Sequence, residues 1–474
     1  MIACVQPKPK ERESMFFESL KQFFPVLILL LAVWFVLSRL PKIDLGQSKA
    51  FQNRRLLNWL PLGLTYAFLY MARYNLTVSK NAFGNLMTNA DFGTIFGVGT
   101  IVYGFAFVIN GPLTDRMGGR KAILIAAAGS ALANFGMGLL TYTGHTSNLA
   151  LSFSILYGLN MYFQSFGAVA IVKVNSAWFH LRERGTFGGI FGILISLGLY
   201  FAYDWGAMIT KNFTLPWVFF IPTLILILFF IISYATVRDL PSQAGFADFD
   251  TGDLSHEKEG EELGALHIAK RMFSHKVIMI IALIEFCSGF IRHAIMNEYI
   301  IFAKQTGIIE NFVAKNWGLL LCCAGILGGV FAGTISDKVF QSRRGPVSAV
   351  LYGFMLVGSI AMVFMLHSPY LGWLMVFMSM AIIGVHGMLS GTASMDFGGK
   401  KNVGTAVGII DGMVYLGAAA QSLLYGTLLP NGDAAKDQNN WISWPAAMIP
   451  IAFIGFVLAM KIWNSQARGQ HTGH

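Results

Sequence analysis

Charged residues are scarce in this chain of 474 residues. Asp, Glu, Lys and Arg make up 12% of it, which is about half of the ~25% usual in soluble domains. Hydrophobic residues make up 55%, and the mean hydropathy is +0.58. This balance excludes an ordinary soluble domain and predicts an all-α polytopic membrane protein.

Cysteines are equally few, and catalytic patterns are missing. Cys4, Cys287, Cys322 and Cys323 follow no metal-ligand or disulfide spacing. The acidic residues are scattered, and the sequence has neither a nucleophile–base spacing nor a Walker-type nucleotide-binding loop. We therefore expect no enzymatic activity, no metal and no cofactor.

The net charge of +10 does not indicate a nucleic-acid partner. The basic residues lie in short loops between hydrophobic runs, for example at Arg120-Lys121, Arg343-Arg344 and Lys400-Lys401. By the positive-inside rule these loops are expected on the cytoplasmic side, so the charges set the orientation in the membrane.

An N-terminal extension, residues 1–55, contains a hydrophobic segment at 23–40. Its ~18 residues are the shortest length that crosses a bilayer. We expect an extra N-terminal membrane helix here, with a helix lying on the membrane surface as the alternative. No small-residue cleavage site follows the segment, which argues against a cleavable signal.

Further apolar segments follow, and each can supply the ~20 residues of a spanning helix. They lie near 57–80, 92–113, 121–143, 148–173, 186–206, 214–236, 276–303, 316–336, 346–367, 369–392, 403–428 and 441–463. The longest hydrophilic stretch separates the first six from the last six. The predicted order is a six-helix bundle at 56–236, a cytoplasmic linker at 237–275, a second six-helix bundle at 276–464 and a tail at 465–474.

The two halves repeat each other. GPLTDRMGGRKA after the second segment matches GTISDKVFQSRRGP after the eighth. Gly185 and Gly404 are separated by 219 positions (404 − 185), and Arg73 and Arg292 by the same 219 (292 − 73). Two bundles related by a pseudo-two-fold axis, with a binding site between them, are the usual plan of many secondary transporters.

Arg73 and Arg292 each lie well inside an apolar segment. A guanidinium at that depth costs from about 3 to more than 10 kcal/mol, so a buried arginine marks a functional site by default. Arginine is always protonated, and its planar fork of donors fits phosphate and carboxylate oxygens. Two such residues facing each other predict a site for a small anion.

Other polar residues near the two arginines are weaker candidates for substrate binding or coupling. Each has a plain structural alternative: packing, a hydrogen bond inside the bundle, or contact with lipid headgroups. For binding they are Tyr66, Tyr70, Lys80, His293 and Tyr415. For coupling or gating they are Glu298 and the intramembrane acid Asp411, which can pair with a cation or take up a proton. Lys173 is interpreted as an interfacial anchor.

The loop after the second segment resembles the signature between helices two and three of the major facilitator superfamily, G-x-L-x-D-R-x-G-R-K/R. Here it runs from Gly111 to Lys121, with Asp115 and Arg116 in place and one inserted glycine. The acid and the bases can pair across helix ends, so we expect a gating role for Asp115, Arg116 and Asp337 of the repeat.

Within that superfamily the chain resembles the organophosphate:phosphate antiporter family over roughly residues 55–464. The matching motifs are Tyr66-x3-Tyr70-x2-Arg73-x-Asn75, Glu183-Arg184-Gly185, Arg292, Ser336-Asp337-Lys338-Val339-Phe340 with Arg344-Gly345, Lys400-Lys401-x2-Gly404-Thr405-Ala406 and Tyr415-Leu416-Gly417. The resemblance implies that Arg73 and Arg292 bind the phosphate group. Phe107, Asn297 and Cys322 stand where the glycerol phosphate member has a lysine and two acids, which leaves the organic part of the substrate open.

The function implied is a secondary active transporter that works by alternating access. It would move a sugar phosphate or glycerol phosphate in exchange for inorganic phosphate, as a monomer in the bilayer of a bacterial inner membrane. Two alternatives stay open. One is a membrane sensor of external sugar phosphate with a signalling partner, and the other is a proton-coupled organic anion transporter.

Overall fold

The computed structural model describes residues 47–144, 148–180, 184–249, 251, 274, 276–340 and 344–464. The predicted helix at 23–40, the tail at 465–474 and most of the predicted linker lie outside these residues. Among the described helices, side chains are not described for 184–191, 333–334, 336–338 and 391–403, nor is that of Asn85. The predicted gating residue Asp337 belongs to this group.

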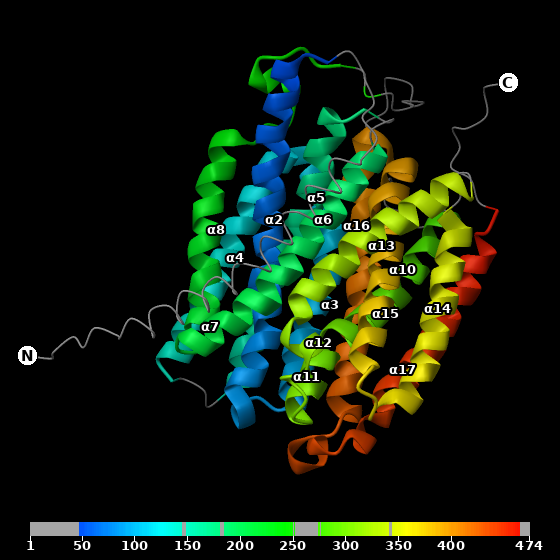
Figure 1. Cartoon of the computed structure of the whole chain (residues 1–474). Helices are drawn as coiled ribbons and strands as arrows, with labels where there is room; N and C mark the ends of the chain where they lie inside the picture. Colours follow the sequence, from blue (N-terminus) through cyan, green and yellow to red (C-terminus); the bar gives the residue numbers. More distant parts are fainter. Residues whose placement is uncertain are drawn as a thin grey trace, which may run out of the picture. The chain divides into compact units, whose positions relative to one another are not determined.

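The first half of the described chain is helical throughout (Figure 1). Its elements are α2 (Lys49–Phe83), η1 (Gly84–Leu86), α3 (Asn89–Met117), α4 (Gly119–Tyr142), α5 (Leu149–Trp178), α6 (Arg184–Tyr200), η3 (Phe201–Trp205), α7 (Gly206–Asn212), α8 (Trp217–Thr236) and η4 (Pro241–Ala244). Segment η3 is a turn of π-helix that joins α6 to α7.

The described part of the second half is also helical. Its elements are α10 (Lys276–Met296), α11 (Glu298–Gln305), α12 (Phe312–Lys315), α13 (Trp317–Lys338), α14 (Arg344–Met365), α15 (Leu371–His386), η5 (Gly387–Ala393), α16 (Ser394–Leu428), η6 (Gly432–Lys436), η7 (Gln438–Ile442) and α17 (Ser443–Lys461). Across the described residues, ten helices are long and apolar enough to cross a membrane. The prediction of an all-α polytopic membrane protein is confirmed.

Local sequence signals explain where α3 begins and ends. Thr88 and Asp91 form a capping box: the Thr88 hydroxyl accepts from the Asp91 amide at 3.1 Å, and the Asp91 carboxylate accepts from the Thr88 amide at 2.9 Å. At the other end Gly118 has φ = 90°, which glycine adopts without strain. Gly118 turns the chain directly into α4, which explains why the loop motif has a glycine at this position.

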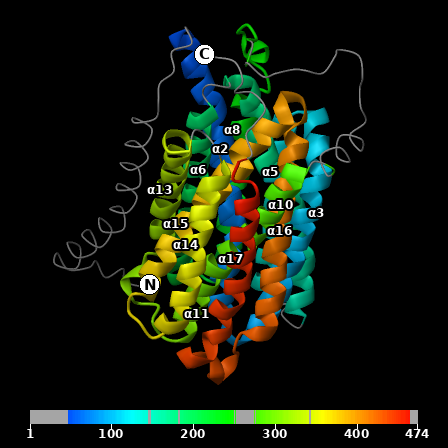
Figure 2. The same cartoon turned by 90° about the vertical axis from the view of Figure 1, so that its right-hand side faces the viewer.

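The packing inside the two halves follows one scheme. In the first half α3 packs on α5, α4 on α8, and α2 on α8. In the second half α13 packs on α15, α14 on α17, and α10 on α17. Figure 1 places α2, α4 and α8 on one side and α14, α15 and α17 on the other, and Figure 2 looks onto α14 and α17. The two halves meet through α3 with α16 and through α6 with α13, which are equivalent pairs under the pseudo-two-fold relation.

Glycines form the contact between α3 and α16 along its whole length. A Cβ on Gly93 would lie 2.8 Å from the Gly426 Cα, and one on Gly104 would lie 2.9 Å from the Gly412 oxygen. Near the far end, Gly111 lies against Gly404. Small residues allow such close approach of membrane helices, so the two halves touch at both ends and in the middle of this seam.

We predict that Gly104→Ala destabilises the protein, because the added Cβ would lie 2.9 Å from the Gly412 backbone oxygen of α16. Overpacking of this kind costs about 1–3 kcal/mol. The thermal unfolding midpoint of the purified protein in detergent should fall accordingly. Gly329→Ala on α13 is the matched control, since a Cβ there meets nothing within 4 Å. Equal midpoints for the two variants would contradict the close seam.

Candidate functional site

Arg73 lies at the centre of the contact between the halves and is fully buried, with 0% of its surface exposed. Its guanidinium donates to three neutral acceptors on three other helices. These are Oε1 of Gln164 on α5 at 2.9 Å, the hydroxyl of Tyr103 on α3 at 2.5 Å and the hydroxyl of Tyr415 on α16 at 2.5 Å. Two of these helices belong to the first half of the chain and one to the second.

Arg292 comes from α10, the equivalent of α2 in the second half, and is 2% exposed. It donates to the same Tyr415 hydroxyl at 3.4 Å, while its Nε has no hydrogen-bond partner among the described residues. The Tyr415 oxygen thus accepts hydrogen bonds from both guanidinium groups. We call Arg73, Arg292, Tyr103, Gln164 and Tyr415 the arginine centre.

Aromatic rings complete the surroundings of Arg73. Its guanidinium carbon lies 4.4 Å from the ring centre of Tyr103, 4.6 Å from that of Tyr70 and 5.3 Å from that of Tyr415. Such cation–π contacts stabilise a cation by about 0.5–2 kcal/mol each. Phe107 stacks on Tyr415, with ring centres 5.7 Å apart.

The arginine centre has positive charge without an acidic partner. Among the described side chains, no carboxylate lies within ion-pair distance of Arg73 or Arg292. Two permanent cations in a buried setting favour an anion strongly, because charges interact more strongly where water is excluded. Two planar forks of donors, one from each half, suit an anion with several oxygens.

Tyr66, Tyr70 and His293, which were predicted to bind substrate, lie near this centre in a series of neighbouring aromatic rings. The rings of Tyr66 and Tyr70 are 5.2 Å apart, and Tyr70 stacks on Tyr74 at 5.9 Å. Tyr74 and His293 are 3.1 Å apart, from the Tyr74 hydroxyl to Nε2. His293 Nδ1 lies 2.9 Å from the Gly289 carbonyl, so Nδ1 carries a proton and a neutral ring accepts from Tyr74 at Nε2. In this form His293 orients Tyr74 and adds no charge.

Lys80 and Glu298 lie away from the arginine centre. Lys80 is two turns beyond Arg73 on α2, about 10 Å along the axis. It is buried and interacts electrostatically with Glu298. Glu298 accepts from the Gln421 side chain at 2.9 Å. The structure therefore places these two predicted residues together, next to α16 but not beside the arginines.

Asp115 joins three helices at the end of the molecule that carries the signature loop. It accepts from Lys173 of α5 at 2.8 Å and from the Thr405 amide of α16 at 3.1 Å. It therefore holds the two halves together at this end. Lys173 pairs with Asp115, so its interpretation as an interfacial anchor was incomplete. The Arg116 side chain is exposed.

A second acid lies at the contact between the halves at the opposite end. Asp204 lies in η3 of the first half, with its carboxylate at the Gly318 and Leu319 amides in the first turn of α13. Nearby, Asn297 accepts from Thr77 at 3.2 Å and from Tyr203 at 3.0 Å. The two halves are therefore in contact near both ends, and both arginines are buried.

Sequence reasoning named Asp115 but missed Asp204, Tyr103, Gln164 and Lys173 as interacting groups. Asp204 lies within a predicted membrane segment, so the rule that flagged Asp411 applies to it equally. Tyr103 and Gln164 carry no such signal, because uncharged polar residues are common in membrane helices. Only the fold shows that they face Arg73.

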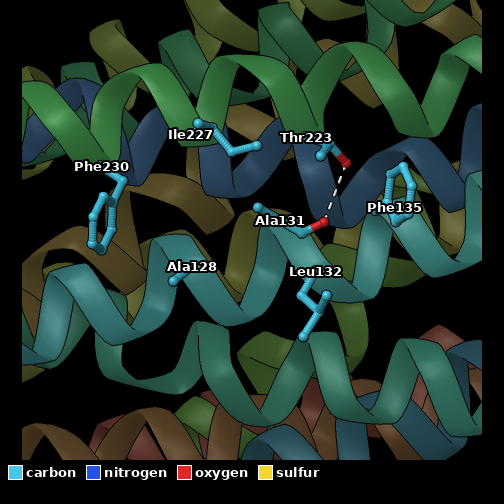
Figure 3. A pocket seen from close by; sticks show the side chains of 7 residues that line it. All are labelled: Ala128, Ala131, Leu132, Phe135, Thr223, Ile227 and Phe230. Carbon is cyan, nitrogen blue, oxygen red and sulfur yellow. Dashed lines mark hydrogen bonds between the residues drawn. The ribbon is translucent and has the colours of Figure 1, made fainter.

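The surface groove between α4 and α8 has a different character (Figure 3). Its volume is about 300 Å³, and its lining is apolar apart from Thr223. The Thr223 hydroxyl is occupied, since it donates to the Ala131 carbonyl at 3.2 Å. Such a groove offers an anion no charged partner. The arginine centre is therefore the candidate site.

The chain resembles known proteins over most of its length. The model of the Major Facilitator Superfamily matches residues 62–422. The chain is 25% identical over 459 residues to a glycerol-3-phosphate transporter of Bacillus subtilis, which covers 90% of this chain and 96% of that protein. It is 24% identical over 450 residues to a probable hexose phosphate transport protein of Chlamydia trachomatis, with 88% and 93% covered. It is also 24% identical over 454 residues to the membrane sensor protein UhpC of Escherichia coli, with 90% and 95% covered.

Solved structures support the fold. A bacterial homolog of the human lysosomal transporter Spinster, inward-facing and unoccupied, matches with a TM-score of 0.64 at 14% identity, covering 88% of this chain and 98% of that one. The nucleoside transporter NupG matches with a TM-score of 0.59 at 14% identity, covering 86% and 98%. At this identity the likeness shows the fold alone.

We predict that Asp115→Asn loosens the end of the seam at Thr405. The change removes a charged hydrogen-bonding group that is worth about 1.5–3 kcal/mol, so the open population at this end should rise roughly tenfold or more. The measurement is the rate at which a water-soluble maleimide labels Ala406→Cys, a buried position beside Thr405, above the background of the native cysteines.

The control for this experiment is Asp433→Asn. Asp433 is exposed and pairs with Lys436 at 2.6 Å in a loop away from the seam. It should leave labelling at Ala406→Cys unchanged. An unchanged rate in Asp115→Asn would show that Asp115 does not hold the halves together.

Proposed function

The chain belongs to the major facilitator superfamily, and we propose that it is a secondary transporter that exchanges a phosphorylated organic anion for inorganic phosphate. The organic anion is of the sugar phosphate or glycerol phosphate class, as the names of its curated relatives indicate. The protein makes and breaks no covalent bond. It acts as a monomer in a bacterial inner membrane.

One observation carries the proposal. Arg73 from the first half and Arg292 from the second half are both buried and both donate to the Tyr415 hydroxyl. An anion at this position would receive charge-assisted hydrogen bonds from both halves. Each such bond contributes about 1.5–3 kcal/mol, which offsets the cost of removing a phosphate group from water.

Exchange follows from where the two charges lie. A phosphate bound between Arg73 and Arg292 draws the two halves together, so the loaded carrier passes readily through the occluded state. Without an anion, the same closure would bring two cations together in a medium of low dielectric. The return step therefore also needs an anion, for which inorganic phosphate suffices.

Alternating access requires that the two ends open in turn. We assign this gating to Asp115 with Thr405 at one end and to Asp204 with the first turn of α13 at the other. Each acid belongs to the first half and lies against backbone of the second. Breaking one contact while the other persists would expose the arginine centre to one side only.

A sensor of external sugar phosphate is the second candidate. The observation that favours it is the similarity to the membrane sensor protein UhpC, at nearly the same identity and coverage as the transporters. A sensor with the same arginine centre would bind phosphate esters and exchange them slowly, while signalling through a partner protein.

We predict that Arg73→Lys and Arg292→Lys each abolish most of the exchange activity. Lysine keeps the charge but loses the bidentate fork, and loss of one charged hydrogen bond of about 1.5–3 kcal/mol reduces activity roughly tenfold to a hundredfold. The measurement is uptake of radiolabelled phosphate into proteoliposomes loaded with unlabelled phosphate. Competition by glycerol phosphate and by hexose phosphates would then identify the organic substrate.

Arg238→Lys is the matched control, because Arg238 lies after the end of α8, remote from the arginine centre, and donates to a backbone carbonyl. It should exchange at the wild-type rate. A wild type that binds hexose phosphate without exchange would favour the sensor. A wild type that neither binds nor exchanges phosphate compounds would refute both.

A further inference from the structure

A second cluster of ionisable side chains is buried inside the second half of the chain, apart from the arginine centre. Glu285 on α10 and His386 on α15 are within hydrogen-bond distance, with 3.0 Å between Oε2 and Nδ1. Glu285 is 0% exposed and His386 4%. Neither residue is assigned a role in anion binding or gating.

Asp411 on α16 adds a second carboxylate to this pair. It is buried, accepts a hydrogen bond from the Ser390 hydroxyl, and interacts electrostatically with both His386 and Glu285. We call Glu285, His386 and Asp411 the acid–histidine cluster. The cluster holds two carboxylates and one imidazole, so a single protonated histidine neutralises only one of the acids.

The polar groups of the cluster are incompletely satisfied. Glu285 Oε1 has no hydrogen-bond partner among the described residues. A buried carboxylate oxygen without a donor is costly when ionised, and binding a proton removes most of that cost.

The other ionisable groups around the cluster come from several helices. The groups that interact electrostatically with Glu285 or Asp411 are Cys287 and Arg292 of α10, Tyr352 of α14 and Tyr103 of α3. Of these, only Arg292 carries a permanent charge, and it belongs to the arginine centre. Lys461 of α17 is exposed. Within the described side chains, the basic groups beside the two carboxylates are therefore His386 and Arg292.

The cluster is connected to the arginine centre through α16. Asp411 is one helical turn before Tyr415, so the two side chains share one face of the helix. Tyr415 contacts both arginines, and Arg292 lies close enough to interact with Asp411. A change of charge at one site therefore changes the electrostatic potential at the other.

We propose that the acid–histidine cluster is a proton-binding site linked to the anion site, so that a proton is taken up by the second half of the chain when a phosphate group binds. The step is a simple protonation, in which a carboxylate or the imidazole gains one proton from water. The inference rests on the proposed function, because it assumes that the arginine centre binds phosphate groups.

The direction of the linkage follows from electrostatics. Before binding, the positive charge of Arg292 lies close enough to interact with Asp411. A phosphate group compensates that positive charge and adds negative charge nearby, which favours protonation of the cluster. Linkage is reciprocal, so lowering the pH through the range in which the cluster titrates must tighten phosphate binding.

The test is isothermal titration calorimetry of the full-length protein in detergent with inorganic phosphate. Measurements in buffers of different ionisation enthalpy give the number of protons taken up on binding. The wild type should take up more protons than the titration of phosphate itself accounts for. Glu285→Gln, Asp411→Asn and His386→Gln should each lose part of this excess, and their affinity should depend less on pH.

Two further variants separate titration from structure. Glu285→Asp keeps an ionisable carboxylate and should retain the excess, whereas Glu310→Gln changes an exposed acid outside the bundle and should behave as wild type. A wild type with no excess overturns the inference, even if cluster variants fail to fold. If the excess proton uptake persists in every folded cluster variant, the proton binds elsewhere, and this result also overturns the inference. If phosphate binds and exchanges in these cases, the proposed function stands, whereas no phosphate binding at all refutes both.

Discussion

Two buried guanidinium groups, which have no carboxylate in ion-pair distance among the described side chains, are the constraint on which the rest of this structure depends. Each costs several kcal/mol to remove from water and lipid headgroups. The protein offsets this cost for Arg73 with neutral acceptors, namely Gln164, Tyr103 and Tyr415, and with aromatic faces. Neutral acceptors stabilise the cation but leave its charge uncompensated. The centre therefore keeps an affinity for anions that a salt bridge would remove.

This constraint explains why the close glycine contact between α3 and α16 is needed for the arginine centre. The acceptors of Arg73 come from α3, α5 and α16, so the arginine is fully satisfied only when both halves are in contact. The close approach at Gly104 and Gly412 brings the Tyr415 side chain within reach of α2 and α3. Larger residues along the seam would separate the halves and leave Arg73 with acceptors from the first half alone.

Much of this architecture could be predicted from the sequence, because membrane proteins follow strong constraints on hydrophobicity and charge. The helices, the repeat and the buried positions of Arg73 and Arg292 follow from apolar runs interrupted by ionisable residues. The partners of Arg73 could not be predicted, because Gln164 and Tyr103 lie in segments without any charge signal. The contact of Phe107 with Tyr415 could not be predicted either, because it depends on how α3 crosses α16.

Asp115 and Asp204, to which we assign the gating, bear on how the halves can part at either end. Asp115 accepts from the Thr405 amide of α16, and Asp204 lies beside Gly318 in the first turn of α13. A contact between a carboxylate and an uncharged backbone amide is weaker than an ion pair between full charges. It also leaves no unpaired basic side chain behind when it breaks. Contacts of this moderate strength at both ends allow either one to open without a large barrier, which is what alternating access requires.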